Sequence, residues 1–386
     1  MQPLEGVRVL DLTHVLAGPC ATHHLRCLGA EVIKVERPVI GDAMRELALR
    51  PELGGLPAGF RALNAGKKSV VLDLASTAGR EALLELARSA DIFVENFRPG
   101  AARRLGLGPE DIRAVRPQII YCSISGWGQA GPNSARGAYD HVIQAATGMM
   151  SLQGATDTPM KVGFPVVDIA TGISAAEAIL AAAVRRLRGD TAPITLDVSM
   201  IDSALALMSG PVTATLDTGR APARVGNRGF VGSPGADTFA TADGHISVAA
   251  NTKGQFVTLC RLLGRPELAA PPHVPEEIAA DAFLFGFATD PLRDALADAF
   301  ASADAGTLER RLNAEGVPSA RVRDLHEYLS EVYSQTPGIG IDGEPLALGP
   351  AFRDGGDRIT LPIAPPLGAD TAGLLSGADA TRIQPW

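Results

Sequence analysis

The chain has 386 residues, with 35 Lys and Arg against 43 Asp and Glu, so its formal net charge is −8 and its pI is near 5.4. At roughly 150 residues per domain, this length predicts two or three domains. The acidic balance, without a basic tail, argues against a nucleic acid as partner.

The four cysteines show no Cys-x-x-Cys spacing, so the sequence predicts neither a metal centre nor a disulfide framework. Reduced thiols in a cytoplasmic protein are expected instead. Charges interrupt the apolar run 7–12, and the stretch 169–184 is judged too short and too polar for a bilayer. Neither a signal peptide nor a membrane partner is therefore expected. The cysteines are Cys20, Cys27, Cys122 and Cys260.

Short apolar runs alternate with helical patterns over the first 125 residues. A helix opened by Pro19 is expected after the first run, and a helix capped by Ser76 or Thr77 after the third. Strands that alternate with helices predict a parallel, helix-covered sheet that binds ligands beyond the carboxyl ends of its strands. The expected strands span residues 7–12, 31–35, 69–74, 91–95 and 118–123.

The Ala-rich segment 169–188 predicts a long helix, because arginines gather near its C-terminal end and Gly189 follows. Asp168 is therefore expected at or just before a helix N-terminus. A further strand is expected at 194–198 and a further helix at about 200–210.

Beyond residue 225 the composition becomes β-rich, and a hairpin is expected between Ala236 and Ala250 around an Asp243-Gly244 turn. Helices are expected from about 255 to 325. The predicted fold class is α/β, with a large Rossmann-like parallel-sheet domain and a smaller α+β domain. The expected boundaries are 1–200 for the first part of the large domain, 226–325 for the small domain and 345–386 for the return to the large domain, with linkers at about 201–225 and 326–344.

The sequence contains neither G-x-G-x-x-G after its first strand nor G-x-x-x-x-G-K-[ST], so it lacks the usual phosphate loops of dinucleotide and NTP sites. Lys and Arg residues still gather after the expected strands, a pattern that suits a phosphorylated ligand. Asp168 is a candidate reactive carboxylate because small residues follow it; the alternative is a helix N-cap. Tyr139 and Asp140 leave the same choice between a binding site and a cap.

Several motifs follow one another within residues 4–172: L-E-G-V-R-V-L-D-L-T-H-V-L-A-G-P, N-A-G-K-K-S-V-V-L-D-L, A-D-I-F-V-E-N-F-R-P-G and G-F-P-V-V-D-I-A-T-G. With further matches at 241–249 and 315–322, the chain resembles the family III CoA-transferases. That family includes formyl-CoA:oxalate and carnitine CoA-transferases and, as a divergent branch, α-methylacyl-CoA racemase. The resemblance implies an interlocked, ring-like homodimer that acts on coenzyme A thioesters and small carboxylic acids without a prosthetic group.

By this resemblance Asp168 is the nucleophile, which attacks the donor thioester and passes through an anhydride to an aspartyl-CoA thioester. A helix N-terminus is expected to keep its carboxylate ionised. The glycine-rich segment 226–235 matches the family's lid, with Gly226, Gly229 and Gly232 as lid or oxyanion residues. The residues assigned to CoA binding are His14, Ala17, Arg37, Lys68, Asn96, Phe97, Arg104, Tyr139 and Asp140.

Two other functions stay open on the sequence. A 2-methylacyl-CoA racemase needs an acid/base pair across an α-carbon; its branch has a histidine before the aspartate of the G-x-D segment, where this chain has Tyr139, and His141 follows Asp140. A CoA-binding protein without turnover is the other alternative. Leu16 stands where the formyl-CoA branch has a glutamine, so the resemblance leaves open whether the acceptor is oxalate-sized.

Overall fold

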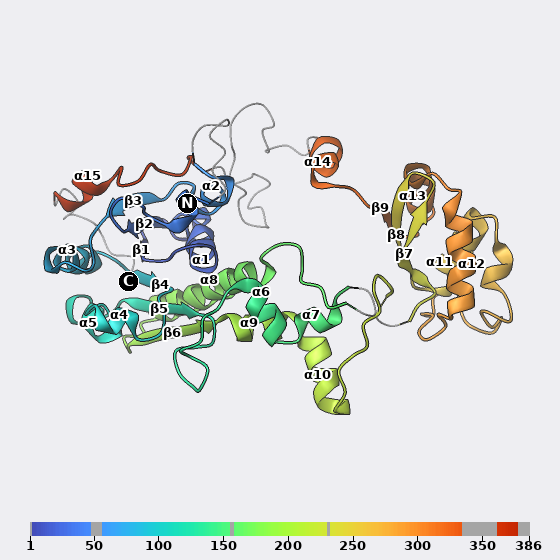
Figure 1. The fold of residues 1–386 in the computed structure, drawn as a ribbon, viewed down its shortest axis with the longest axis horizontal. Helices are drawn as coiled ribbons and strands as arrows, with labels where there is room; N and C mark the ends of the chain where they lie inside the picture. Colours follow the sequence, from blue (N-terminus) through green and yellow to red (C-terminus); the bar gives the residue numbers. More distant parts are fainter. Residues whose placement is uncertain (1, 48–55, 155–157, 230–231, 334–360, 377–386) are drawn as a thin grey trace. The chain divides into compact units, whose positions relative to one another are not determined.

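The computed structural model describes residues 2–47, 56–154, 158–229, 232–333 and 361–376 (Figure 1). The chain divides into two compact units, each with its own core. The first unit comprises residues 1–150, 161–222 and 338–386, and the second comprises 151–160 and 223–337.

The first unit is built on a six-stranded parallel sheet with the strand order β3-β2-β1-β4-β5-β6. The order reverses between β1 and β4, which is where open α/β sheets leave a crevice for ligands beyond the carboxyl ends of the strands. The predicted parallel sheet is confirmed. Its strands are β1 (Arg8–Asp11), β2 (Glu31–Glu36), β3 (Lys68–Val71), β4 (Ile92–Glu95), β5 (Ile120–Ser125) and β6 (Ile194–Ser199).

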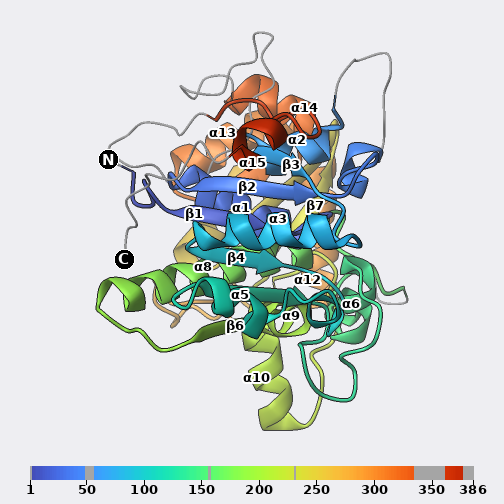
Figure 2. The same ribbon diagram turned by 90° about the vertical axis from the view of Figure 1, so that its left-hand side faces the viewer.

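Helices cover both faces of this sheet (Figures 1 and 2). On one face α1 (Ala17–Cys27) and α8 (Val166–Leu187) share a core with the strands. On the other face α3 (Thr77–Arg88) and α5 (Pro109–Val115) build a second core layer. The remaining helices of this region are the 3-10 turn η1 (Ala43–Arg45), α2 (Ala58–Asn64), α4 (Ala101–Arg104), α6 (Asp140–Ala146), α7 (Met149–Leu152), α9 (Met200–Leu207), α10 (Ser209–Thr218) and α15 (Thr371–Leu375).

The helix α8 has 22 residues and is, by length and composition, apolar enough to cross a membrane: an 18-residue window of it has a mean hydropathy of 1.6. The expectation that the stretch 169–184 is too short is therefore wrong, because the helix extends beyond both of its ends. Of its most apolar 18-residue window 44% is buried, and Val167, Ala175 and Ile179 belong to the core shared with α1. Packing on the sheet accounts for its apolar composition.

Local chemistry explains where several elements begin. The Ser76 side chain accepts a hydrogen bond in the first turn of α3, which confirms the predicted cap. Helix α1 begins at Ala17, two residues before the predicted start at Pro19. The helix expected at about 200–210 is confirmed as α9, which the Ser199 hydroxyl caps directly after β6. A second helix, α10, follows within the segment 201–225 that was predicted to be a linker.

The second unit contains an antiparallel sheet of order β7-β8-β9, made of β7 (Gly235–Thr241), β8 (Gly244–Ala250) and β9 (Ser319–Arg321). The predicted hairpin is confirmed, but its turn is Ala242-Asp243, one residue before the predicted Asp243-Gly244, because Gly244 already pairs with Thr241. Strand β9 was not predicted, because three residues are too few to show an alternating pattern. The helices here are α11 (Lys253–Leu262), η3 (Pro266–Ala269), α12 (Asp290–Ala301), α13 (Ala305–Ala314), α14 (Leu325–Tyr328) and the π-helical turn η4 (Leu329–Tyr333).

Of the C-terminal segment 345–386, predicted to return to the large domain, the structure describes residues 361–376. The Ser69 amide donates a 2.8 Å hydrogen bond to the Asp370 carboxylate, and the Val71 amide bonds Thr371. Residues 361–376 therefore lie beside β3. The rest of that segment, and residues 334–344 of the second predicted linker, lie outside the described residues.

Candidate active site

Asp168 is the third residue of α8, in its first turn, and its side chain is half-buried. The cap of α8 is Pro165, so Asp168 does not cap its own helix. Within the described part of the chain, no group donates a hydrogen bond to the Asp168 carboxylate and no cation pairs with it. The sequence thus placed Asp168 correctly at a helix start, and the structure leaves its oxygens available.

The first turns of α8 lie close against α1. A Cβ atom at Gly172 would meet the Cys20 Cβ at 2.6 Å and the Ala17 carbonyl oxygen at 2.8 Å. A side chain at this position would force the two helices apart. The small residues after Asp168 are therefore explained first by close helix packing, which also fixes Asp168 relative to Ala17.

Asp140 supplies the cap that Pro165 cannot. One of its oxygens, Oδ2, accepts hydrogen bonds from the backbone amides of Val167, at 2.7 Å, and Asp168, at 3.1 Å. The other, Oδ1, accepts a 2.5 Å hydrogen bond from the Gln144 side chain. Asp140 therefore joins the start of α6 to the start of α8. Sequence analysis placed Asp140 among the CoA-binding residues and raised a cap on its own helix as the alternative; the observed partner is another helix.

The ionisation of Asp168 differs from the expectation. Burial, followed by the negative charge of Asp140, raises the pKa of Asp168 from 3.8 to about 7. The expected stabilisation of the carboxylate by a free helix N-terminus is wrong, because Asp140 already occupies the two amides and brings a like charge. Asp168 therefore changes its protonation state near neutral pH.

A second group of predicted residues meets at the crevice between β1 and β4. The His14 amide donates a 2.9 Å hydrogen bond to the Asn96 side-chain oxygen, and the Asn96 side-chain nitrogen donates a 2.8 Å bond to the His14 carbonyl. The Phe97 ring lies 5.8 Å from the His14 ring. Burial and the charge of Lys34 lower the pKa of His14, which favours a neutral imidazole. Three residues assigned to CoA binding are thus brought together.

A buried ion pair between Lys34 and Asp42, which was not predicted from the sequence, fixes the loop after β1. The Lys34 ammonium lies 2.9 Å from the Asp42 carboxylate and donates a 2.7 Å hydrogen bond to the Thr13 carbonyl. Asp42 also accepts a 3.1 Å hydrogen bond from the Val15 amide, and Val15 has a positive φ of 69°. The available signal was a lysine inside the strand sequence E-V-I-K-V-E, where a parallel sheet buries both faces.

A second missed residue, Lys67, is fully buried beneath α1. Its ammonium lies 3.1 Å from the Asp11 carboxylate and donates hydrogen bonds to the Thr22 hydroxyl and the Asn64 side chain. Burial lowers the pKa of Lys67 to about 8. Sequence analysis had named its neighbour, Lys68, and had no pattern to distinguish the two.

Lys68 points elsewhere. Its ammonium pairs at 2.5 Å with Glu31, the first residue of β2, whereas His14 and Asn96 follow the carboxyl ends of their strands. The structure therefore does not bring Lys68 to those two residues. Arg37 is exposed and donates a 3.1 Å hydrogen bond to the carbonyl of residue 41.

Two more assigned residues lie on the surface of the first unit. Arg104 is exposed at the end of α4, in the segment that follows β4. Tyr139 precedes α6 and is 69% exposed, with its ring stacked on that of His141 at 6.4 Å. CoA binding by Arg104 and Tyr139 stays a prediction.

The glycine-rich segment belongs to the second unit. Gly226 and Gly232 have positive φ values of 64° and 68°, and a Cβ at Gly229 would meet the Ala236 Cβ at 2.8 Å. All three positions thus favour glycine, which explains the spacing without a catalytic role. Their part in a lid or oxyanion site stays a prediction.

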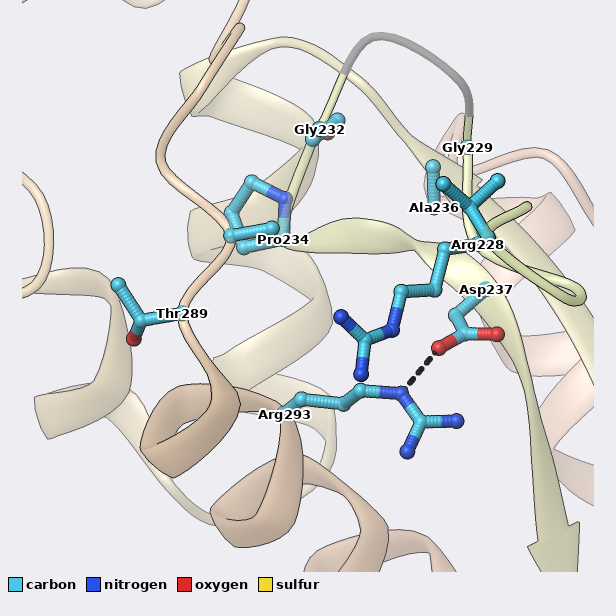
Figure 3. A pocket seen from close by; sticks show the side chains of 11 residues that line it. Arg228, Gly229, Gly232, Pro234, Ala236, Asp237, Thr289 and Arg293 are labelled. Carbon is cyan, nitrogen blue, oxygen red and sulfur yellow. Dashed lines mark hydrogen bonds and ion pairs between the residues drawn. The ribbon is translucent and has the colours of Figure 1, made fainter. Parts of the chain in front are cut away.

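Beside this segment lies a hollow of about 190 Å³, which the side chains of Arg228 and Arg293 enter from the loop and from α12 (Figure 3). Arg293 pairs with Asp237 at 2.6 Å, and Arg228 pairs with Asp290 at 3.0 Å. Both guanidinium groups are therefore already matched by carboxylates. Across the described ranges, no three His, Cys, Asp or Glu side chains gather as metal ligands.

Comparison with known proteins agrees with this architecture. The chain is 40% identical over 269 residues to succinyl-CoA:glutarate CoA-transferase of Mus musculus, a match that covers 69% of this chain and 61% of that protein. It is 37% identical over 328 residues to acetyl-CoA:oxalate CoA-transferase of Acetobacter aceti, covering 84% of this chain and 82% of that protein.

Among solved structures, a CAIB/BAIF family protein from Brucella suis is similar over 98% of this chain and 100% of its own, with a TM-score of 0.86 and 31% identity. The family model of CoA-transferase family III matches residues 4–368, nearly the whole chain. This chain therefore belongs to CoA-transferase family III.

Proposed function

We propose that this chain is a CoA-transferase that moves CoA from an acyl-CoA donor to a free carboxylic acid, with Asp168 as covalent nucleophile. One observation carries the assignment: a half-buried carboxylate, without a hydrogen-bond donor among the described residues, begins the helix that closes one face of the sheet. The names of the relatives support it, since they transfer CoA to glutarate and to oxalate.

The proposed reaction balances without any further reactant. A carboxylate oxygen of Asp168 attacks the thioester carbonyl, the C–S bond breaks, and an aspartyl anhydride and CoA thiolate result. The thiolate attacks the aspartyl carbonyl, which releases the donor acid and leaves an aspartyl-CoA thioester. The acceptor carboxylate then attacks the aspartyl-CoA carbonyl, which releases CoA thiolate and forms a second anhydride. The thiolate attacks the acceptor's carbonyl in that anhydride, which gives the new CoA thioester and frees Asp168. One thioester and one carboxylate enter and leave, so neither ATP nor redox chemistry is required.

The residues around Asp168 support this chemistry in different ways. With a pKa near 7, Asp168 is a stronger base than an ordinary aspartate, yet a large fraction is ionised at neutral pH. The paired backbone of His14 and Asn96 gives the loop after β1 a fixed shape at the strand-order reversal. We propose this crevice as the CoA-binding region, with Phe97 as an apolar surface.

The test is acyl exchange. The purified chain is incubated with succinyl-CoA or acetyl-CoA and a panel of mono- and dicarboxylic acids, and new thioesters are identified by mass spectrometry. We expect a new CoA thioester with at least one acid, lost in Asp168→Asn. Asp202→Asn is the matched control, because Asp202 is likewise the third residue of its helix, α9.

Three other outcomes would contradict the proposal. Acyl exchange at the normal rate in Asp168→Asn would show that Asp168 is not the nucleophile. Incorporation of deuterium at the α-carbon of a 2-methylacyl-CoA in heavy water, without exchange between acids, would identify a racemase. Tight CoA binding without either reaction would identify a binding protein.

We further propose a cytoplasmic homodimer, interlocked as in the resemblance. Apolar side chains stay exposed on successive helices of the first unit: Ile173 on α8, Leu207 at the end of α9 and Leu216 on α10, the last 79% exposed. Such a surface favours a protein partner. Light scattering that shows a monomer at micromolar concentration would contradict the dimer. Of the described cysteines all four are buried thiols, which suits a reducing compartment.

A further inference from the structure

The first turn of α8 is held by a side chain from another helix. A helix leaves its first four amides without intrahelical partners, and a proline cap offers no side-chain acceptor. Here the amide of Val166 bonds the Phe164 carbonyl, whereas those of Val167 and Asp168 bond Asp140. Asp140 therefore holds the backbone of the residue whose side chain is the proposed nucleophile.

Asp140 is itself fixed on its far side. The Gln144 side chain, one turn along α6, donates to Asp140 Oδ1 at 2.5 Å and accepts a 2.9 Å hydrogen bond from the Val162 amide. Gln144 is fully buried. Asp140 thus receives three N–H donors from three residues, a pattern that suits an ionised carboxylate. The chain from Val162 through Gln144 and Asp140 to α8 is continuous.

We propose that Asp140 is a positioning residue, which fixes the first turn of α8 and acts on Asp168 through its negative charge. The inference rests on the proposed role of Asp168 and deepens it. Two separate effects follow from the geometry. The hydrogen bonds from Asp140 fix the backbone of Asp168 and therefore the position of its Cβ atom. The negative charge of Asp140 opposes loss of the Asp168 proton.

Besides Asp140, several titratable residues lie on the elements that pack against α8. Cys20 on α1 faces the same turn, with its sulfur 3.9 Å from the Ile169 carbonyl, but burial raises the pKa of its thiol to about 11, so it stays neutral. Burial and the charge of Asp140 are the causes that raise the pKa of Asp168. The titratable residues on the elements packed against α8 are Cys20, His23, His24, Arg26 and Cys27 on α1, Tyr121 and Cys122 on β5, Asp140 and His141 on α6, Asp197 on β6 and Asp202 on α9.

Two substitutions separate the hydrogen bonds from the charge. In Asp140→Asn the side-chain oxygen can still accept from both amides of α8, because Asn is as good a cap as Asp. The charge is lost, and so is the hydrogen bond from Gln144, because the Asn amino group then faces the Gln144 amino group. In Asp140→Ala the cap and the charge are both lost. Ser76→Ala is the matched control: it removes a helix cap of the same unit, at α3, whose side chain accepts from the Gly79 amide.

The readouts are single-turnover formation of the Asp168 adduct from acyl-CoA, measured between pH 5 and 9, and the steady-state kcat and KM of acyl exchange. For Asp140→Asn we expect the acid limb to move to lower pH by about one unit, with the plateau rate kept within about threefold. For Asp140→Ala we expect kcat to fall about tenfold or more, with the KM for acyl-CoA changed less than about twofold. Ser76→Ala is expected to lower the melting temperature without moving the pH profile.

The outcomes distinguish this inference from the proposed function. If the unsubstituted chain forms no Asp168 adduct, the proposed function fails, whatever Asp140 does. If it forms the adduct and Asp140→Asn has the same pH profile, the charge effect is refuted. If Asp140→Ala loses no more kcat than Ser76→Ala, or if Asp140→Asn fails to restore it, the positioning role is refuted.

Discussion

Replacing the Asp168 carboxylate by an amide is expected to stabilise the protein at alkaline pH. The pKa of Asp168 is about 7 in the folded chain, against 3.8 ordinarily, so the folded state favours the neutral form. The resulting stability is complete below pH 4 and is lost as the pH rises through 7. Asp168→Asn keeps the neutral shape at every pH, so its advantage should grow over that window.

The size of the effect follows from the same values. At 1.4 kcal/mol per tenfold change, a pKa raised from 3.8 to about 7 corresponds to at most about 4 kcal/mol. Solvent reaches the half-buried carboxylate, so we expect about 2 kcal/mol, or roughly 5 °C in melting temperature at pH 8. The advantage should shrink toward zero near pH 4.

The assay is thermal unfolding of both proteins, followed by circular dichroism between pH 4.5 and 8.5. Asp190→Asn is the control of opposite sign, because backbone and Arg185 hydrogen bonds lower the pKa of Asp190, so the amide should not stabilise at pH 8. Equal or lower stability of Asp168→Asn at pH 8 would refute the argument that burial and a like charge disfavour the Asp168 carboxylate.

Three further changes test other parts of the structure. Gly172→Ala should destabilise by about 1–3 kcal/mol, since its Cβ would lie 2.6 Å from a neighbouring side chain, whereas Gly210→Ala, with open space around it, should not; chemical denaturation compares them. Lys67→Met should cost about 3–5 kcal/mol at pH 7, because it leaves the Asp11 carboxylate buried without its partner; a smaller loss below pH 3 would confirm the cause. Asn96→Ala should weaken CoA binding about tenfold in calorimetry, since it frees the loop after β1; unchanged affinity would remove that loop from the CoA site.

The sheet and the hairpin could be predicted because their signals are local. Period-two and continuous apolar runs mark the strands, and Ser76 marks a helix start. The Asp243-Gly244 pair marks the hairpin turn to within one residue. Asp168 could be placed at a helix start for the same reason. Its ionisation could not, because burial and the charge of Asp140, 28 residues earlier, act through space.

Other features depend on partners that no spacing reveals. Lys67 and Lys68 are adjacent in sequence, yet one is buried against Asp11 and the other reaches Glu31 on the surface. The inward orientation of Lys67 depends on Asp11, Thr22 and Asn64, which come from three separate segments of the chain. The sequence pattern therefore predicted where polar side chains gather along the chain, and tertiary contacts decide the partner of each side chain.

The most direct measurement of the central claim is chemical trapping on Asp168. The chain is mixed with an acyl-CoA donor, quenched with hydroxylamine, digested and mapped by tandem mass spectrometry, with the donor-free chain as control. The account predicts a hydroxamate at Asp168 that requires the donor and forms more slowly below pH 6. An active enzyme that transfers CoA while Asp168 stays unmodified under these conditions would contradict it.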